Sequence, residues 1–485
     1  MKVSLINNTT YLKRNVPLGL GYVASYLINE GHDVSIYDPP PYRPQSVEEF
    51  IKKEKPEIVA FNCSTHTYPH AVQMARDIKK IIPEVKIAVG GVHPSVMPKE
   101  TITQSHGALD FSIMEEGELT MAELCEKLEK DGVLKGVKGL AFQEKGLVTV
   151  NEKRPMVDNL DILPMPARHL FPMHWYTRRC TTIRGMWLGL TNLIASRGCY
   201  AHCTFCGSHT VLGRKMRYHS ISRVLDEMEY LIDKYKIEAL LFNDDTFNAD
   251  VKRVMLLCKG MKERKIDIKW HCQCRTTPVT NEMVEAMAKA GCIQVSVGAE
   301  SGSDRVLKNI KKGALAKSTY DSLTTFNKHG IRTLANWIVG LPGESWEEFE
   351  KTLDLAVRTG ADYNEFYLAT PYPGTELWEQ AVKAGWVKAD LSFDKFQHGD
   401  WDSSVMEIDV PFKELKKMQA KGREMFVKGK IADYAKNPIF LKDAFLISVM
   451  NPSLYGKILG GIIRGKGIEK SLRHFEKVQR ARSFP

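Results

Sequence analysis

The chain has 485 residues, of which 43% are hydrophobic and 26% are charged. This length exceeds one hydrophobic core and indicates two or three domains. No apolar run reaches the roughly 18 residues that a membrane span needs, and the N-terminus enters a strand pattern without a signal-peptide core. These features exclude an integral membrane protein and predict a cytoplasmic one, in which ten cysteines are not expected to form a disulfide framework.

Residues 1–145 alternate short apolar strands with amphipathic helices, which is typical of repeated βα units. Strands are expected at 3–6, 34–37, 58–61, 87–89 and 111–114, and helices near 18–30, 46–54, 68–81, 98–104 and 118–130. This order predicts an α/β fold with a doubly wound parallel sheet of Rossmann-like type. Ligands of such sheets bind beyond the carboxyl ends of the strands. Small, polar and glycine residues occupy those ends here.

Prolines interrupt residues 146–192, so we expect a connector there. Residues 193–390 then show a second βα series. Its strands are expected at 193–196, 239–243, 269–272, 294–298, 332–339 and 365–369, and its helices near 221–235, 250–264, 281–290, 316–329, 345–358 and 375–384. Six such units predict a partial (β/α)6 barrel of TIM type, with its chemistry at the carboxyl ends of the strands. Residues 391–485 are predicted to form a basic helical C-terminal region.

The net charge of +10 is concentrated in this C-terminal region. Residues 411–485 contain 17 Lys or Arg and 6 Asp or Glu, a net charge of +11, so the remainder is close to neutral. One interpretation of the apolar and basic stretch 439–461 is a peripheral contact with anionic lipid at the inner face of a membrane. The other is a helical cap with solvated lysines. No platform of aromatic and basic residues indicates nucleic-acid binding.

Three cysteines follow the first expected barrel strand at positions i, i+4 and i+7: Cys199, Cys203 and Cys206. Thiolates at this spacing in one loop can each reach a different iron of a cubane cluster. Three protein ligands leave the fourth iron open, so it can bind and reduce a small molecule. The alternative is a structural zinc site completed by His202 or His209.

The motif Cys-x-x-x-Cys-x-x-Cys, with aromatic Phe205 before its last cysteine, resembles that of the radical S-adenosylmethionine (SAM) superfamily. The resemblance covers roughly residues 190–390. It implies a [4Fe-4S] cluster that binds SAM through the methionine amino and carboxylate groups. Reduction by an external donor of the flavodoxin or ferredoxin type then cleaves SAM to methionine and a 5′-deoxyadenosyl radical.

The same resemblance implies SAM contacts at later strand ends. Asp244 or Asp245 would accept from the SAM ammonium group, and Glu300 resembles the ribose-binding acid. Arg275 would pair with the SAM carboxylate, although a surface arginine is the alternative. Gly340 and Gly343 would let the backbone approach the adenine.

An α/β domain before such a barrel resembles the cobalamin-binding subclass, which includes class B methylases and the anaerobic magnesium-protoporphyrin ester cyclase. The expected cobalamin-binding residues lie after the first, third and fourth strands: Pro17, Gly19, Gly21, Ser64, Thr65, Gly90, Gly91 and His93. The Asp-x-His-x-x-Gly signature is missing, so His93 is expected near the ligand edge and not as a ligand of cobalt. A domain that binds no cobalamin is the alternative.

The resemblance therefore predicts methylation of an unactivated carbon, in which cobalamin supplies the methyl group and is remethylated by a second SAM. The alternative is a radical cyclase or rearrangement enzyme of the chlorophyll-cyclase kind. The substrate would be a small molecule, or a lipid or other anionic compound in view of the basic tail. A methylthiotransferase is disfavoured, because the N-terminal domain has only Cys63 and Cys125 for a second cluster.

Overall fold

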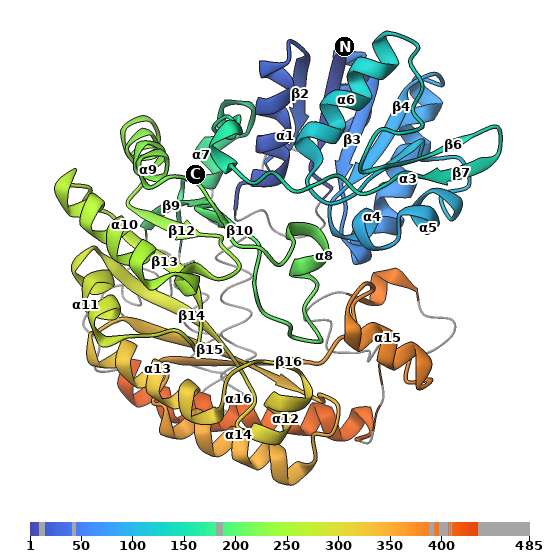
Figure 1. Cartoon of the computed structure of the whole chain (residues 1–485). Coiled ribbons are helices and arrows are strands. Elements are labelled where there is room, and N and C mark those ends of the chain that lie inside the picture. The colour runs from blue at the N-terminus through green and yellow to red at the C-terminus, as the bar shows by residue number, and fades with distance from the viewer. Residues whose placement is uncertain are drawn as a thin grey trace, which may run out of the picture.

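The computed structural model describes residues 1–8, 15–40, 45–180, 188–387, 392–396, 406, 408 and 410–434. It contains two seven-stranded sheets, each with its own helices, joined by a connector (Figure 1). The predicted α/β architecture is confirmed. Residues 439–461 lie outside the described part of the chain. None of the described helices is long and apolar enough to cross a membrane.

The N-terminal sheet has the strand order β2-β1-β3-β4-β5-β6-β7. Its first five strands are parallel: β1 (Lys2–Ile6), β2 (Asp33–Tyr37), β3 (Ile58–Asn62), β4 (Lys86–Gly90) and β5 (Phe111–Ile113). Two antiparallel strands that were not predicted extend it, β6 (Leu140–Glu144) and β7 (Leu147–Val150). Lys145 and Gly146 both have positive φ, as a two-residue hairpin turn requires. The sheet therefore continues past residue 145, where the connector was expected to begin.

Helices cover both faces of this sheet, as a doubly wound fold requires. They are α1 (Leu18–Asn29), α2 (Val47–Glu54), α3 (Tyr68–Ile81), α4 (Val92–Val96), α5 (Pro98–Thr103) and α6 (Gly117–Glu129), with the 3-10 turn η1 (Thr65–Thr67). Ser46 and Glu49 form a capping box that starts α2, because each side chain satisfies a backbone N–H of the first turn. The connector contributes Leu160 and Trp175 to the core on the α1 and α6 side.

The second sheet is a partial barrel of order β16-β15-β14-β13-β12-β9-β8. Its parallel strands are β9 (Leu188–Leu193), β12 (Ala239–Phe242), β13 (Lys269–Arg275), β14 (Cys292–Glu300), β15 (Arg332–Val339) and β16 (Tyr363–Leu368), with β8 (Arg179–Cys180) antiparallel at one edge. Burial alternates strictly along β15, so one face of the strand packs on helices and the other faces the barrel interior.

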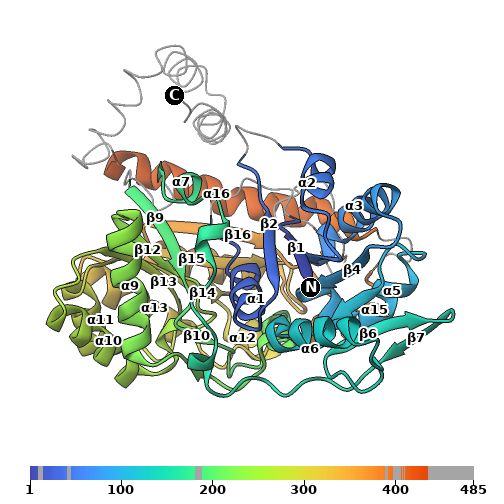
Figure 2. The same ribbon diagram turned by 90° about the horizontal axis from the view of Figure 1, so that it is seen from above.

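Five helices lie on the outer side of the sheet (Figure 1): α9 (Ile221–Tyr235), α10 (Val251–Glu263), α11 (Asn281–Lys289), α13 (Ala316–Lys328) and α14 (Trp346–Arg358). The short helix α12 (Asp304–Asn309) follows β14. Helix α15 (Glu376–Lys383) follows β16 and lies apart from the outer helices, where Leu377 N donates to Thr204 O at 2.8 Å. The last described helix, α16 (Phe412–Tyr434), runs beside β16 (Figure 2). Gln419 of α16 donates to the Phe366 carbonyl at 2.9 Å.

The first barrel strand differs from the prediction. It ends at Leu193, where the expected strand 193–196 was to begin. Ser196–Arg197 instead forms β10, which pairs antiparallel with β11 (Arg217–Tyr218) in a separate two-stranded sheet. Residues 188–193 form the first barrel strand. The polar residues Ser196 and Arg197 lie outside the barrel sheet and lead into the loop that carries the cysteines.

Candidate functional site

The three cysteines lie in a loop, residues 198–216, which we call the cluster loop. The β10–β11 pair closes its base. Gly198 has φ +95°, and a Cβ there would lie 2.3 Å from the Lys215 carbonyl oxygen, so only glycine fits. Within the loop, Cys199 N donates to Gly213 O at 3.2 Å and Arg214 Nη1 donates to Ala201 O at 2.6 Å. Contacts within the loop therefore support its backbone.

The thiols of the cluster loop share one environment. Cys203 is buried, while Cys199 and Cys206 are partly buried. The pKa of Cys206 is raised to about 11, mainly by burial and in smaller part by negative charge on Cys203, Asp245 and Cys199. Three clustered thiols of this kind suit iron, whose positive charge would favour their thiolate forms.

The zinc alternative finds no fourth ligand in this geometry. His209 Nδ1 lies 3.1 Å from the Cys206 carbonyl oxygen, and His202 is exposed. Among the residues that the structure describes, no three His, Cys, Asp or Glu side chains converge as ligands of one ion. Ligands of a cubane need no common point, because each binds a different iron.

Arg275 is the last residue of β13 and is 8% exposed, so the surface alternative is wrong. Its Nη1 lies 3.6 Å from Cys203 Sγ, and its Nη2 donates to the Lys312 carbonyl. The guanidinium thus contacts a cysteine of the loop. Its predicted pairing with the SAM carboxylate remains a prediction.

The two adjacent aspartates have different roles. Asp244 Oδ1 accepts from Ala195 N at 2.8 Å and Oδ2 accepts from Ser196 Oγ at 2.5 Å. Burial raises the pKa of Asp244 to about 6. This carboxyl group holds the start of the cluster loop, so we withdraw it as the acceptor for the SAM ammonium group. Asp245 accepts from Ser208 Oγ at 2.5 Å and remains the candidate.

Glu300 ends β14 in a strained backbone conformation. Its φ is +64°, and the register with β15 shifts between Gly298 and Glu300. Strain in a non-glycine residue is common at functional sites. Its carboxylate pairs with the buried Lys312 Nζ at 2.7 Å. Sequence reasoning missed Lys312, because no motif marks a lysine that pairs across 12 residues.

The two glycines expected near adenine have structural reasons of their own. Gly340 and Gly343 both have positive φ. A Cβ on Gly340 would lie 3.0 Å from the Leu415 side chain, and one on Gly343 would lie 3.0 Å from Asn309. Gly340 N also donates to Glu344 Oε2 at 2.6 Å. The turn therefore requires glycine for its own packing, and the adenine contact stays a prediction.

The expected cobalamin residues after β3 and β4 lie at one sheet edge. Ser64 and Thr65 enter η1 directly after β3. Gly90 ends β4 and Gly91 follows it. A Cβ on Gly91 would lie 2.8 Å from the Cys63 carbonyl oxygen, at φ +106°, so glycine is what allows the ends of β3 and β4 to come into close contact.

His93 is fully buried at this edge, with 0% exposure. Neither ring nitrogen has a hydrogen-bond partner among the residues that the structure describes, and burial lowers the pKa of His93 to about 4. The ring lies 4.5 Å from that of Tyr68 and 4.9 Å from that of Phe393, between ring centroids. Because an unsatisfied buried polar group costs about 1–3 kcal/mol, this edge fits a domain that binds a further polar group.

The three residues after β1 that were expected to contact cobalamin differ in their surroundings. Pro17 is partly buried, and Gly19 is exposed with nothing within 4 Å of its Cβ position. Gly21 is buried, and a Cβ there would lie 3.0 Å from Pro166 of the connector. Gly21 therefore serves helix packing, and we withdraw it from the expected cobalamin contacts.

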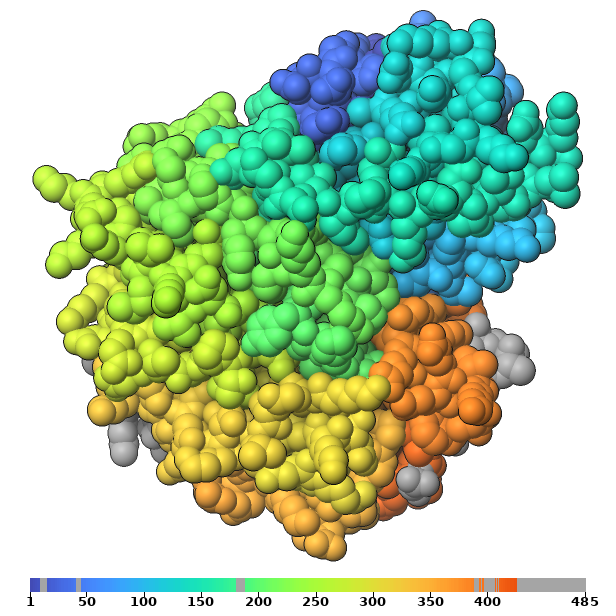
Figure 3. Space-filling model, in the orientation of Figure 1, coloured from blue at the N-terminus to red at the C-terminus, as the bar shows by residue number. Residues whose placement is uncertain are grey.

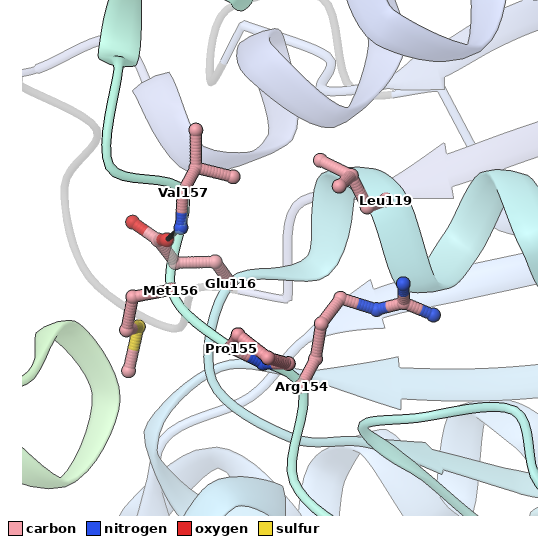
Figure 4. A pocket seen from close by; sticks show the side chains of 6 residues that line it. All are labelled: Glu116, Leu119, Arg154, Pro155, Met156 and Val157. Carbon is pink, nitrogen blue, oxygen red and sulfur yellow. Dashed lines mark hydrogen bonds between the residues drawn. The ribbon is translucent and has the colours of Figure 1, made fainter.

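A buried ionic network that sequence reasoning missed joins the two domains. Arg197, two residues before Cys199, pairs with Glu116 Oε1 at 2.9 Å and Glu118 Oε1 at 2.7 Å. Arg217 pairs with Glu116 Oε2 at 2.7 Å. Beside the network, Glu116 Oε2 also accepts from Val157 N at 3.3 Å in a small pocket between α6 and the connector (Figure 4). Charges of both domains thus hold the cluster loop against the N-terminal sheet.

A helix follows the expected cluster site and another follows the expected cobalamin edge, and these two helices are in contact. Helix α8 (Ser208–Leu212), just after the cysteines, packs against α4, just after Gly91. The turn after β16 joins them, because a Cβ on Gly374 would lie 2.4 Å from Val96 and 3.5 Å from Thr210. Figure 3 shows the green cluster loop in the centre, between the N-terminal domain and the region of α15. The turn after β16 is therefore a joint between the two domains.

Comparisons with known proteins agree with this arrangement. The family model of the radical SAM superfamily matches residues 193–356, and that of the B12 binding domain matches residues 5–125. An uncharacterized methyltransferase of Pyrococcus horikoshii is 36% identical over 368 residues, which cover 76% of this chain and 78% of the relative. Cytidylyl-2-hydroxyethylphosphonate methyltransferase of Streptomyces wedmorensis is 28% identical over 481 residues, covering 85% and 89% of the two chains.

Two solved structures share the fold. The cobalamin-dependent SAM radical enzyme OxsB, with aqua-cobalamin and SAM bound, has a TM-score of 0.72 at 19% identity and covers 99% of this chain and 75% of its own. The methyltransferase TsrM of Kitasatospora setae, with tryptophan and a SAM analogue bound, has a TM-score of 0.68 at 18% identity and covers 80% and 77%. Both solved structures therefore have a fold similar to that of this chain.

Proposed function

Because the chain belongs to the radical SAM superfamily and carries its B12-binding domain, we propose that it methylates an unactivated carbon of a small molecule. The cofactors of this class are a [4Fe-4S] cluster, SAM and cobalamin. The cluster and SAM supply a 5′-deoxyadenosyl radical, and cobalamin carries the methyl group. In the proposal, Cys199, Cys203 and Cys206 hold the cluster.

The observation that carries the proposal is the contact between the two helices that follow the expected cofactor sites. Helix α4 follows Gly91 and helix α8 follows Cys206, and the two helices pack on each other. A methyl group held at the first edge and a substrate radical formed near the second would therefore meet in one space. The Arg197–Glu116 pair joins the two domains, and fixed positioning is a large part of catalysis between two reactants.

The residues on the concave face of the barrel support a polar substrate as the acceptor of the methyl group. Gln273 is exposed although β13 lies between β12 and β14, so solvent reaches this face. His271 Nε2 lies 3.0 Å from Ser296 Oγ, and the buried Asn336 Oδ1 has no partner in the described part of the chain. A face with unsatisfied hydrogen-bonding groups favours a polar substrate over a hydrocarbon lipid.

The electron donor would approach the outer side of the cluster loop. Tyr200 is 41% exposed there, and the neighbouring side chains of His202 and Lys215 are exposed. A basic surface beside the cysteines suits an acidic flavodoxin or ferredoxin. The membrane contact and the lipid substrate depended on residues 439–461, which lie outside the described part of the chain.

The test is anaerobic reconstitution of the full chain, followed by measurement of iron, sulfide and cobalt and of the products of SAM turnover. We expect about four irons per chain, one cobalt, and both deoxyadenosine and S-adenosylhomocysteine. Deoxyadenosine without S-adenosylhomocysteine would favour the cyclase alternative. A Cys203→Ala variant that keeps full iron content and SAM cleavage would refute the cluster site.

A further inference from the structure

Two of the three cysteine sulfurs have a hydrogen-bonding neighbour from another barrel strand end. Arg275 Nη1 lies 3.6 Å from Cys203 Sγ, and Thr246 Oγ1 lies 3.2 Å from Cys199 Sγ. Both neighbours are buried, with 8% exposure for Arg275 and 1% for Thr246. Once the cysteines are thiolates they can only accept hydrogen bonds, so the guanidinium and the hydroxyl would be the donors.

Arg275 is held firmly in this position. Asn248 accepts from Arg275 N at 2.9 Å and donates to Arg275 O at 3.0 Å. The other end of the guanidinium donates to the Lys312 carbonyl. Since Lys312 also pairs with Glu300, the arginine lies between the cluster loop and the acid at the end of β14. Its fixed charge therefore stays beside the sulfur.

We propose that Arg275 and Thr246 raise the reduction potential of the cluster, an inference that rests on the cluster site proposed above. Reduction adds one electron to the cluster and breaks no bond in the protein, and part of the added charge lies on the sulfur ligands. A buried cation and a hydroxyl donor stabilise the reduced state more than the oxidised state. Arg275 has the larger effect because it carries a full charge in a site of low polarity.

The experiment is a potentiometric titration of the reconstituted full-length protein, without SAM, followed by the EPR signal of the reduced cluster. At the midpoint potential of the wild type, Arg275→Gln should lower the ratio of reduced to oxidised cluster about tenfold, which is about 59 mV for a one-electron couple. Arg275→Lys retains the charge and should restore most of the ratio. Thr246→Val should lower the ratio by a smaller factor, and Thr246→Ser should restore it.

The matched control is Arg214→Gln. Arg214 also supports the cluster loop, because its side chain donates to the Ala201 carbonyl. This side chain is exposed, and none of its described hydrogen bonds goes to a cysteine sulfur. The control variant should leave the potential unchanged. The proposal is overturned if Arg275→Gln, with wild-type iron and sulfide content, has the potential of the Arg214→Gln variant.

If Arg275→Gln fails to assemble a cluster, Thr246→Val decides the question, and an unchanged potential in that variant overturns the proposal. A wild-type chain that binds no iron would overturn the cluster site itself. Iron content thus separates failure of the proposed function from failure of this inference.

Discussion

The cluster loop and the ligand edge of the N-terminal sheet lie against each other but are stabilised in different ways. Charged and polar side chains support the loop, among them Arg197, Arg217 and Asp244. At the other edge, small residues bring strand ends together, and the buried His93 ring has no hydrogen-bond partner among the described residues. The loop thus depends on ion pairs and hydrogen bonds within the protein, whereas the edge depends on close backbone packing. The following predictions test this contrast.

The largest expected effect comes from Arg197→Met. Removing this cation leaves Arg217 as the remaining cation beside the buried Glu116 carboxylate, and takes from the buried Glu118 its ion-pair partner. Loss of one partner of a buried pair costs about 3–5 kcal/mol, which thermal and denaturant unfolding would measure. Arg179→Met, in an exposed pair with Glu238, is the control and should change little. Equal effects of the two variants would contradict the importance of the buried network.

The next effect depends on pH and concerns His93. Its folded pKa of about 4 lies below the ordinary 6.5, so the unfolded chain binds the proton more readily. Stability from neutral His93 is present above about pH 6.5 and is lost as pH falls toward 4, on the order of 3 kcal/mol in total. His93→Phe should remove this part of the pH dependence, as measured by thermal midpoints of the apo protein between pH 7 and 4.5. Parallel curves for the two proteins would disprove it.

A smaller loss is expected for Gly91→Ala. The added Cβ would approach the Cys63 carbonyl at 2.8 Å, in a backbone conformation that disfavours side chains, so we expect a cost of about 1–3 kcal/mol. Cobalt retained after gel filtration should fall as well. Gly31→Ala is the matched control, because Gly31 also has a positive φ (+89°) but its Cβ would meet nothing within 4 Å, so its loss of stability should be smaller and its cobalt content unchanged. A stable, cobalt-loaded Gly91→Ala variant would show that close approach is not required there.

The smallest effect is expected for Lys215→Ala. Its ion pair with Asp158 is exposed on both sides, and such pairs contribute little. The Lys215 carbonyl, which packs against Gly198, is retained in alanine. Thermal midpoint and iron content should therefore match the wild type. A clear loss of iron would mean that surface charge also supports the cluster loop.

Most elements could be predicted because their signals are local. Helix α9 begins and ends where the periodicity of 221–235 predicted, and β4 and β15 also lie where expected. The hairpin of β6 and β7 was missed because strand 147–150 has little burial to give a pattern. The start of the barrel was misplaced because residues 193–196 run from the end of β9 to the start of β10 and contain no strong breaker.

The sequence by itself determined the two βα series, the spacing of Cys199, Cys203 and Cys206, and through them the family, because periodicity and loop spacing act over a few residues. Only the tertiary structure decided which groups surround the cysteines. Arg197 meets Glu118 across 79 positions and Arg275 meets Cys203 across 72. Such contacts depend on how two sheets and their loops pack, and no local pattern encodes them. For the same reason Asp244 changed from an expected SAM contact to a support of the loop.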